Sequence, residues 1–192
     1  MTSPAIYLAS KSPRRAELLA QIGIRFEVMS VDVPELLKAG ESPSEFVQRL
    51  ALDKARAGWQ VSEKILPVLG ADTIVVLDDE IMGKPVLEGD AERMLSALSG
   101  RQHMVMTAVA MVKDENEAIR LSTSQVSFRE TTKAERKAYI ATGEPMDKAG
   151  SYAIQGQAAV FIGKLEGSYS GVMGLPLFET AELFREFGIH DT

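Results

Sequence analysis

The chain of 192 residues contains no cysteine, which excludes disulfide bonds, thiolate catalysis and zinc sites built on cysteine. Its two histidines, His103 and His190, are too few for a multi-histidine metal site, and we interpret His190 as an ordinary residue near the chain end. No apolar run reaches the ~18 residues needed to span a bilayer, and the N-terminal "MTSPAIYLAS" has no basic leader. We therefore expect a cytoplasmic protein with no membrane partner.

The chain also lacks an excess of positive charge, with 21 Lys and Arg against 27 Asp and Glu. Its formal net charge is −6 and its pI is about 5.1, whereas a nucleic-acid-binding protein normally presents a basic face. We expect no nucleic-acid partner. Hydrophobic residues make up 45% and charged residues 25%, as in ordinary globular proteins, and the length suits one domain.

Helical and strand-like segments alternate along the chain. Strands are expected over residues 5–10, 25–33, 103–114 and 118–130, the last two forming a hairpin. Helices are expected over residues 13–22, 42–59, 88–99, 132–142 and 176–187. The segment 148–176 is rich in glycine and predicts short strands and loops. This order predicts an α/β or α+β fold on a mixed sheet.

Two arginines stand where cations are normally disfavoured, in the first turn of the first expected helix. Ser12 is placed to cap that helix and Pro13 to start it. A helix N-terminus attracts phosphate, and the side chains of Arg14, Arg15, Ser10 and Ser12 would add donors. The alternative is that both arginines are simply solvated.

Two carboxylates are candidates for metal or proton chemistry. Asp72 lies in "LGADT", where an apolar strand is expected to stop, and a carboxylate there can hold a metal or polarise a water. The alternative is a turn aspartate that bonds to its own backbone. Glu35, in an acidic loop, is a weaker candidate, since such residues are usually only solvated.

Several further polar residues suit a polyphosphate ligand. Pro85 keeps Lys84 extended, so that this lysine can reach a phosphate, whereas Lys54 and Lys148 equally suit a solvated surface. Gln155 in "IQG" could bond to a nucleobase edge or simply lie in a loop. Neither a P-loop nor a dinucleotide-binding glycine motif is present. Together these residues predict a site for a metal-bound polyphosphate, although they would also allow a plain metal-dependent phosphatase.

Seven motifs in order make the sequence resemble the Maf family of nucleoside triphosphate pyrophosphatases. They are "LASKSPRRAELL", "RLALDKA", "LGADTIV", "GKP", "LSG", "DKAGSYAIQG" and "GLPL", from residue 7 to about 177. The resemblance implies one Maf-like domain over residues 1–192, with an inosine triphosphate pyrophosphatase-like α/β fold. It also implies a long mixed sheet, two lobes around a central cleft, a divalent metal (Mg²⁺ or Mn²⁺) and a homodimer.

Three positions resemble the dTTP/UTP-hydrolysing subgroup of that family. These are "SPRR" at 12–15, "ADT" at 71–73 and "IQG" at 154–156. The 7-methyl-GTP subgroup instead carries Trp at position 14, Ser-Asp-Gln for "ADT" and Ser-Glu-Gly for "IQG". The resemblance thus implies hydrolysis of dTTP and UTP to the monophosphate and pyrophosphate, with a role in cleaning the nucleotide pool.

The resemblance also implies a role for each candidate residue. Asp72 matches the proton acceptor and a metal ligand. Glu35 is the expected second metal ligand, with Asp32 as the alternative, because "DVPE" at 32–35 departs from the adjacent acids usual in the family. Substrate choice would depend on Arg14, Thr73 and Gln155. Phosphate binding would fall to Ser10, Ser12, Arg15, Lys54 and Lys84.

Two other functions remain open at this point. The family name is tied to arrest of septum formation, which allows a nucleotide-binding regulator of cell division. A pyrophosphatase of the 7-methyl-GTP subgroup is the second alternative, and the three subgroup positions argue against it.

Overall fold

The computed structural model describes residues 3–189, so His190 lies outside the described residues. The strands in this range form a seven-stranded sheet in the order β2-β1-β3-β5-β6-β7, with β4 paired to β3. The pairs β1–β2 and β1–β3 are parallel, whereas β3–β4 and β6–β7 are antiparallel, which confirms the predicted mixed sheet. The strands are β1 Ile6–Ala9, β2 Phe26–Met29, β3 Val68–Leu77, β4 Glu80–Met82, β5 Gln102–Lys113, β6 Asn116–Phe128 and β7 Ile162–Glu166.

Six α-helices are present in the described range. They are α1 Pro13–Gln21, α2 Pro43–Val61, α3 Glu88–Leu98, α4 Lys133–Ile140, α5 Tyr169–Met173 and α6 Leu177–Glu186. No helix of the described part is long and apolar enough to cross a membrane. The chain divides into two compact units. Unit 1 comprises residues 1–72, 107–122 and 174–192, and unit 2 comprises residues 73–106 and 123–173.

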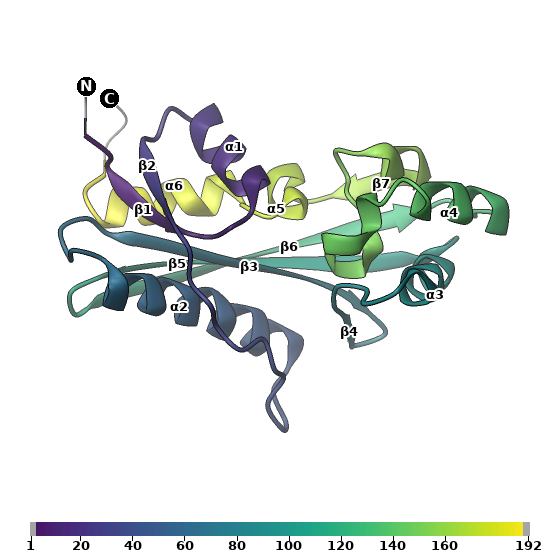
Figure 1. The fold of residues 1–192 in the computed structure, drawn as a ribbon, viewed down its shortest axis with the longest axis horizontal. Coiled ribbons are helices and arrows are strands. Elements are labelled where there is room, and N and C mark those ends of the chain that lie inside the picture. Colours follow the sequence, from purple (N-terminus) through teal and green to yellow (C-terminus); the bar gives the residue numbers. More distant parts are fainter. Residues whose placement is uncertain (1–2, 190–192) are drawn as a thin grey trace. The chain divides into compact units, whose positions relative to one another are not determined.

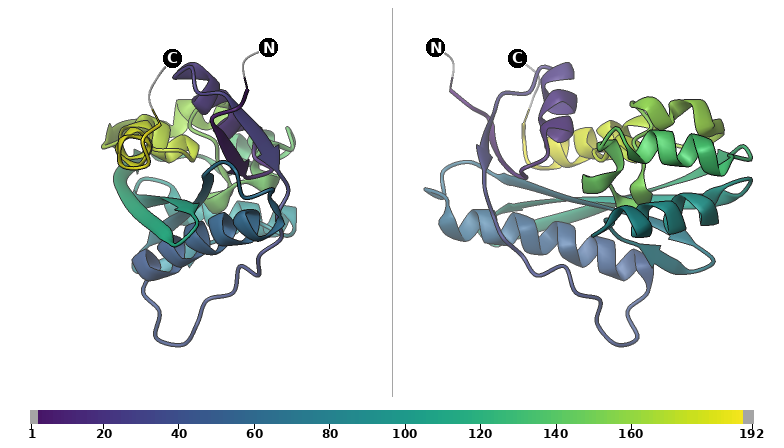
Figure 2. Two further views of the ribbon diagram at one scale, coloured as in Figure 1. Left: turned by 90° about the vertical axis from the view of Figure 1, so that its left-hand side faces the viewer. Right: turned by 45° about the vertical axis from the view of Figure 1, so that its right-hand side comes forward.

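Unit 1 places helices on both faces of its strands. In Figures 1 and 2, α2 lies along one face and α6 along the other. Ser42 caps α2 through the predicted capping box with Glu45, whose backbone N–H donates to the Ser42 side chain. This box fixes where α2 begins and hence which of its residues face the sheet.

Two glycines let α2 pack closely on the sheet of unit 1. A Cβ built on Gly70 of β3 would lie 2.4 Å from the Ala51 carbonyl oxygen and 2.6 Å from the Ala55 nitrogen. On α2 itself, a Cβ at Gly58 would lie 2.7 Å from a methyl group of Val68. Only glycine permits this approach, which brings the side chains of α2 within reach of β3.

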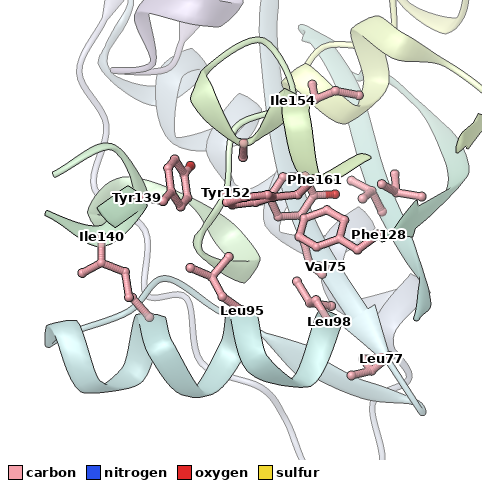
Figure 3. Packing of buried hydrophobic residues seen from close by; sticks show 14 residues of the cluster. Val75, Leu77, Leu95, Leu98, Phe128, Tyr139, Ile140, Tyr152, Ile154 and Phe161 are labelled. Atoms are coloured by element: carbon pink, nitrogen blue, oxygen red, sulfur yellow. The ribbon is translucent and has the colours of Figure 1, made fainter. Parts of the chain in front are cut away.

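Unit 2 is built around an aromatic and aliphatic cluster. Figure 3 shows Leu95 and Leu98 of α3 pointing toward Phe128, Tyr152 and Phe161. The Phe128 and Tyr152 rings pack edge-on, with their centroids 4.9 Å apart. His103 is buried in the same cluster, 2.8 Å from the Tyr152 hydroxyl through Nε2.

Most expected elements are present with shorter bounds, and one expectation is wrong. The 103–114 and 118–130 segments form neighbouring strands β5 and β6, joined at Asp114, and Thr132 caps α4 as predicted. Three 3-10 helices, Glu144–Asp147, Ala149–Ser151 and Gln157–Phe161, occupy part of the glycine-rich segment. The strand expected to stop at Asp72 instead runs on to Leu77, so Asp72 is a mid-strand residue and not a turn aspartate.

Candidate active site

The position of Asp72 follows from strand alternation. Gly70 faces α2, and residues two apart in a strand share a face, so Asp72 also faces α2. Asp72 is buried, with 6% of the residue exposed. A buried carboxylate needs a charged or hydrogen-bonding partner, and the helix packed against Gly70 supplies it.

That partner is Lys54, one turn along α2 from Ala51. Its Nζ lies 2.5 Å from Asp72 Oδ1 and 2.6 Å from Glu35 Oε1. Glu35 is on the loop that joins β2 to α2, residues 30–42, hereafter the 30–42 loop. The Asp72 side chain is 9% exposed and that of Glu35 43%, so the two carboxylates approach one ammonium from the interior and from the solvent side.

The surroundings shift the pKa of Asp72 upward. Burial raises it, nearby Lys54 and Arg15 lower it, and Glu35 raises it further. The net effect is a carboxylate that binds a proton more readily than an exposed aspartate does. A proton acceptor in catalysis needs this property.

Arg15 is fixed at the start of α1 by two hydrogen bonds. Its Nε donates to the Gly174 carbonyl oxygen over 2.7 Å, and its Nη1 donates to Ser10 Oγ over 3.2 Å. Burial lowers the pKa of Arg15, an effect that the charges of Asp72 and Glu35 oppose. The guanidinium remains protonated. Arg15 therefore brings a half-buried, oriented positive charge close to both carboxylates.

The other residues of the first motif lie around this arginine. Ser12 occupies the predicted N-cap position of α1, but its side chain makes no capping hydrogen bond, and its backbone N–H donates to Ser10 Oγ. Arg14 is close enough to lower the pKa of Arg15. Unit 1 thus brings together the side chains of Ser10, Arg15, Glu35, Lys54 and Asp72.

The remaining candidates belong to unit 2. Thr73 follows Asp72 in β3 and is partly exposed. Lys84 is exposed between β4 and α3, in a segment tied by the hydrogen bond from Gly150 N–H to the Gly83 carbonyl over 3.1 Å. That bond joins the "GKP" motif to "DKAG". The Lys148 side chain bonds to the Glu144 carbonyl and pairs with Asp147, contacts that suit a role in local structure.

Gln155 is exposed on a turn held at both ends by one side-chain pair. The Tyr139 hydroxyl accepts from Ala153 N–H over 3.3 Å and donates to Glu144 Oε1 over 2.8 Å. Glu144 Oε2 accepts from Gln157 N–H over 3.1 Å. This contact keeps the Glu144 carboxylate against Gly156, where an added Cβ would lie 2.2–2.6 Å from it, which explains the glycine of "IQG".

A family model described as Maf-like protein matches residues 5–187. The chain belongs to the Maf family. This finding confirms the family resemblance carried by the seven motifs.

Curated relatives of this Maf chain bear the name that the subgroup positions predict. The dTTP/UTP pyrophosphatase of Alkalilimnicola ehrlichii is 58% identical and covers 97% of this chain, which spans 94% of the relative. Proteins of the same name from Saccharophagus degradans and Nitrosomonas europaea are 53% and 52% identical. They cover 97% and 98% of this chain, which spans 90% and 99% of them.

A solved structure supports the fold. The Staphylococcus aureus Ham1 protein matches with a TM-score of 0.51 and 15% identity, covering 95% of this Maf chain and 96% of its own. At this identity the likeness shows the fold alone, and it agrees with the predicted long mixed sheet flanked by helices.

Two groups of residues around the candidates were missed by sequence reasoning. One is Arg49 of α2, which bonds to Leu36 and Glu41 of the 30–42 loop, and the other is Tyr139 and Glu144 beside the Gln155 turn. The i,i+4 spacing of Arg49 and Asp53 was a visible signal. Glu41 lies in the 30–42 loop, so its pairing with Arg49 of α2 depends on the path of that loop. Helical spacing in the sequence does not predict this path.

Proposed function

We propose that this Maf chain hydrolyses dTTP and UTP to the nucleoside monophosphate and pyrophosphate. The observation that carries the proposal is the convergence of Asp72 and Glu35 on Lys54 Nζ, with half-buried Arg15 close by. Relatives more than half identical in sequence bear the name of this activity. The geometry supports the proposal because it brings a buried carboxylate and two positively charged side chains close together, as a proton acceptor and phosphate ligands would need to be.

In the proposed reaction Asp72 accepts a proton from the attacking water. The water oxygen forms a bond to the α-phosphorus, and the bond from the α-phosphorus to the bridging oxygen breaks, so that oxygen leaves with pyrophosphate. Arg15 and Lys54 stabilise the negative charge that develops on the leaving group, and Lys84 is proposed to do the same. Ser10 and Ser12 are proposed to donate hydrogen bonds to phosphate oxygens.

The donor set of unit 1 fits a hard divalent cation. Glu35 and Asp72 supply carboxylate oxygens, and Mg²⁺ or Mn²⁺ commonly binds to one or two carboxylates plus substrate phosphates. In the described residues no group of three or more His, Cys, Asp or Glu side chains is placed to hold a metal. We therefore propose that these two carboxylates hold the ion together with the triphosphate. A bound ion would polarise the phosphate oxygens.

Substrate choice is proposed to depend on Arg14, Thr73 and Gln155. The exposed Gln155 amide can both donate and accept, as recognition of a pyrimidine edge requires. A homodimer and a cytoplasmic location complete the proposal, the latter because free nucleoside triphosphates would be the substrates. Light scattering on the purified chain tests the dimer.

The decisive experiment offers the purified chain a panel of nucleoside triphosphates with Mg²⁺ or Mn²⁺. Both products are quantified. We expect equal amounts of monophosphate and pyrophosphate, with dTTP and UTP hydrolysed fastest. Release of orthophosphate and a diphosphate would contradict the proposed bond cleavage, and a preference for 7-methyl-GTP would contradict the proposed substrates.

A further inference from the structure

The 30–42 loop carries Glu35 but has little apolar anchorage beside it. Leu36 and Leu37, which follow Glu35 directly, are 75% and 56% exposed. Burial of these side chains therefore does not hold the loop in place. Next to Glu35, polar contacts are what hold the loop on α2.

Arg49 of α2 provides such contacts. Its Nη2 donates to the Leu36 carbonyl oxygen over 3.0 Å, immediately next to Glu35 in the chain. Its Nε and Nη2 also bind both Glu41 carboxylate oxygens, over 2.5 Å and 2.7 Å. One guanidinium thus contacts the loop at the residue after Glu35 and again near the start of α2.

The surroundings of Arg49 make it a fixed support. The Arg49 side chain is 19% exposed and that of Glu41 is 9% exposed. Nη1 contacts Asp53 Oδ2 at 3.4 Å, and the guanidinium carbon lies 5.4 Å from the centre of the Phe46 ring. The bond to Arg49 lowers the pKa of Glu41 to about 2, so this carboxylate stays charged in any neutral buffer.

We propose that Arg49 is a positioning residue that holds the 30–42 loop on α2 and so keeps the Glu35 carboxylate on Lys54. The consequence for catalysis rests on the proposed function, whereas the effect on the loop does not. Lysine cannot replace arginine here, because one ammonium lacks the planar fork that binds two carboxylate oxygens and a carbonyl together.

Hydrogen exchange of backbone amides tests the effect on the loop. Arg49→Met should speed exchange at residues 30–42 at least tenfold and leave the rest of unit 1 unchanged. The matched control is Arg56→Met on the same helix, which removes a similarly short bidentate pair, at 2.7 Å and 2.6 Å, with Glu117 of β6 and not with the loop. Unchanged loop exchange in Arg49→Met would overturn the proposal.

A double-mutant cycle with Glu35 tests the effect on catalysis. Arg49→Met should lower kcat/KM for dTTP about tenfold by misplacing Glu35, but less than twofold when Glu35 is already replaced by Gln. The kcat/KM of Arg49→Lys should exceed that of Arg49→Met by less than threefold. The kcat/KM of Arg56→Met should stay within twofold of the wild-type value. Equal losses in both backgrounds, or full recovery by lysine, would overturn the proposal.

The two experiments separate this proposal from the proposed function. If the wild-type chain releases no pyrophosphate from dTTP or UTP, the function fails, and hydrogen exchange still decides whether Arg49 holds the loop. If the wild type is active and the exchange is unaffected, only the role of Arg49 fails. Melting curves of each variant confirm that it is folded.

Discussion

Unit 1 holds its candidate residues by contacts between charged side chains, whereas unit 2 presents Gln155 by tying down the backbone on both sides of it. Lys54 contacts both Asp72 and Glu35 directly. Around Gln155 the contacts are made by Tyr139 and Glu144 to the amides of Ala153 and Gln157. We infer that substitutions in unit 1 act mainly through charge, and those around Gln155 through shape.

Asp72→Asn should have the largest effect, because it removes the proposed proton acceptor with almost no change in shape. We expect hydrolysis of dTTP to fall about a thousandfold, or ~4 kcal/mol in the barrier. Pyrophosphate release measures the loss, and circular dichroism checks the fold. Activity within tenfold of the wild type would show that another group accepts the proton.

Arg14 and Arg15 are neighbours in unit 1 with different proposed roles, so substituting each tests whether charge alone explains this unit. Arg15→Ala should weaken hydrolysis of every substrate about a hundredfold, or ~3 kcal/mol, because it removes a fixed positive charge. Arg14→Trp should mainly change which substrate is preferred. This result would show that a residue of unit 1 also contributes to substrate choice. kcat/KM across the triphosphate panel measures both. Equal, unselective losses from both variants would refute this division of roles.

Two glycines offer a matched pair, one from each unit. In Gly70→Ala the new Cβ would meet the backbone of α2 at 2.4 Å and 2.6 Å, so we expect a loss of ~3 kcal/mol in the free energy of unfolding. In Gly156→Ala it would meet only the end of the flexible Glu144 side chain. Stability should then fall by under ~1 kcal/mol.

The readout that distinguishes these glycine variants is substrate choice. Displacing Glu144 removes its contact to Gln157 N–H, which should alter the dTTP to UTP preference of Gly156→Ala. The folded molecules of Gly70→Ala should keep the wild-type preference between dTTP and UTP. Urea denaturation and a two-substrate assay provide the measurements, and the opposite pattern would reverse the comparison.

Local sequence signals predicted the elements well and the contacts between them poorly. Ser42 and Glu45 lie within one helical turn, so their capping box was readable from the sequence. Asp72 was misinterpreted as the end of a strand, because a buried carboxylate inside a strand requires a partner that the local sequence does not show. That partner, Lys54, lies 18 residues earlier and reaches Asp72 only because Gly70 lets α2 approach.

A stability loss smaller than that of Gly70→Ala is expected on acidification, from His103 in the aromatic cluster of unit 2. Burial lowers the pKa of His103 to about 4, from 6.5 for an exposed histidine. As the pH falls below 6.5 the unfolded chain binds a proton that the folded chain does not, so stability is lost on acidification. Between pH 6.5 and pH 5 the loss should be ~2 kcal/mol.

His103→Gln keeps a polar group near Tyr152 but cannot titrate, so this variant should lose less stability than the wild type between pH 7 and pH 5. Urea denaturation at the two pH values measures the difference. The window stays above pH 4.5, because the carboxylates of Glu41 and Glu135, whose pKa values are lowered to about 2, cost stability only below it. If the wild type and the variant lose the same stability on acidification, the unit 2 core tolerates a charged His103. The contrast between a charged site in unit 1 and an uncharged core in unit 2 would then be wrong.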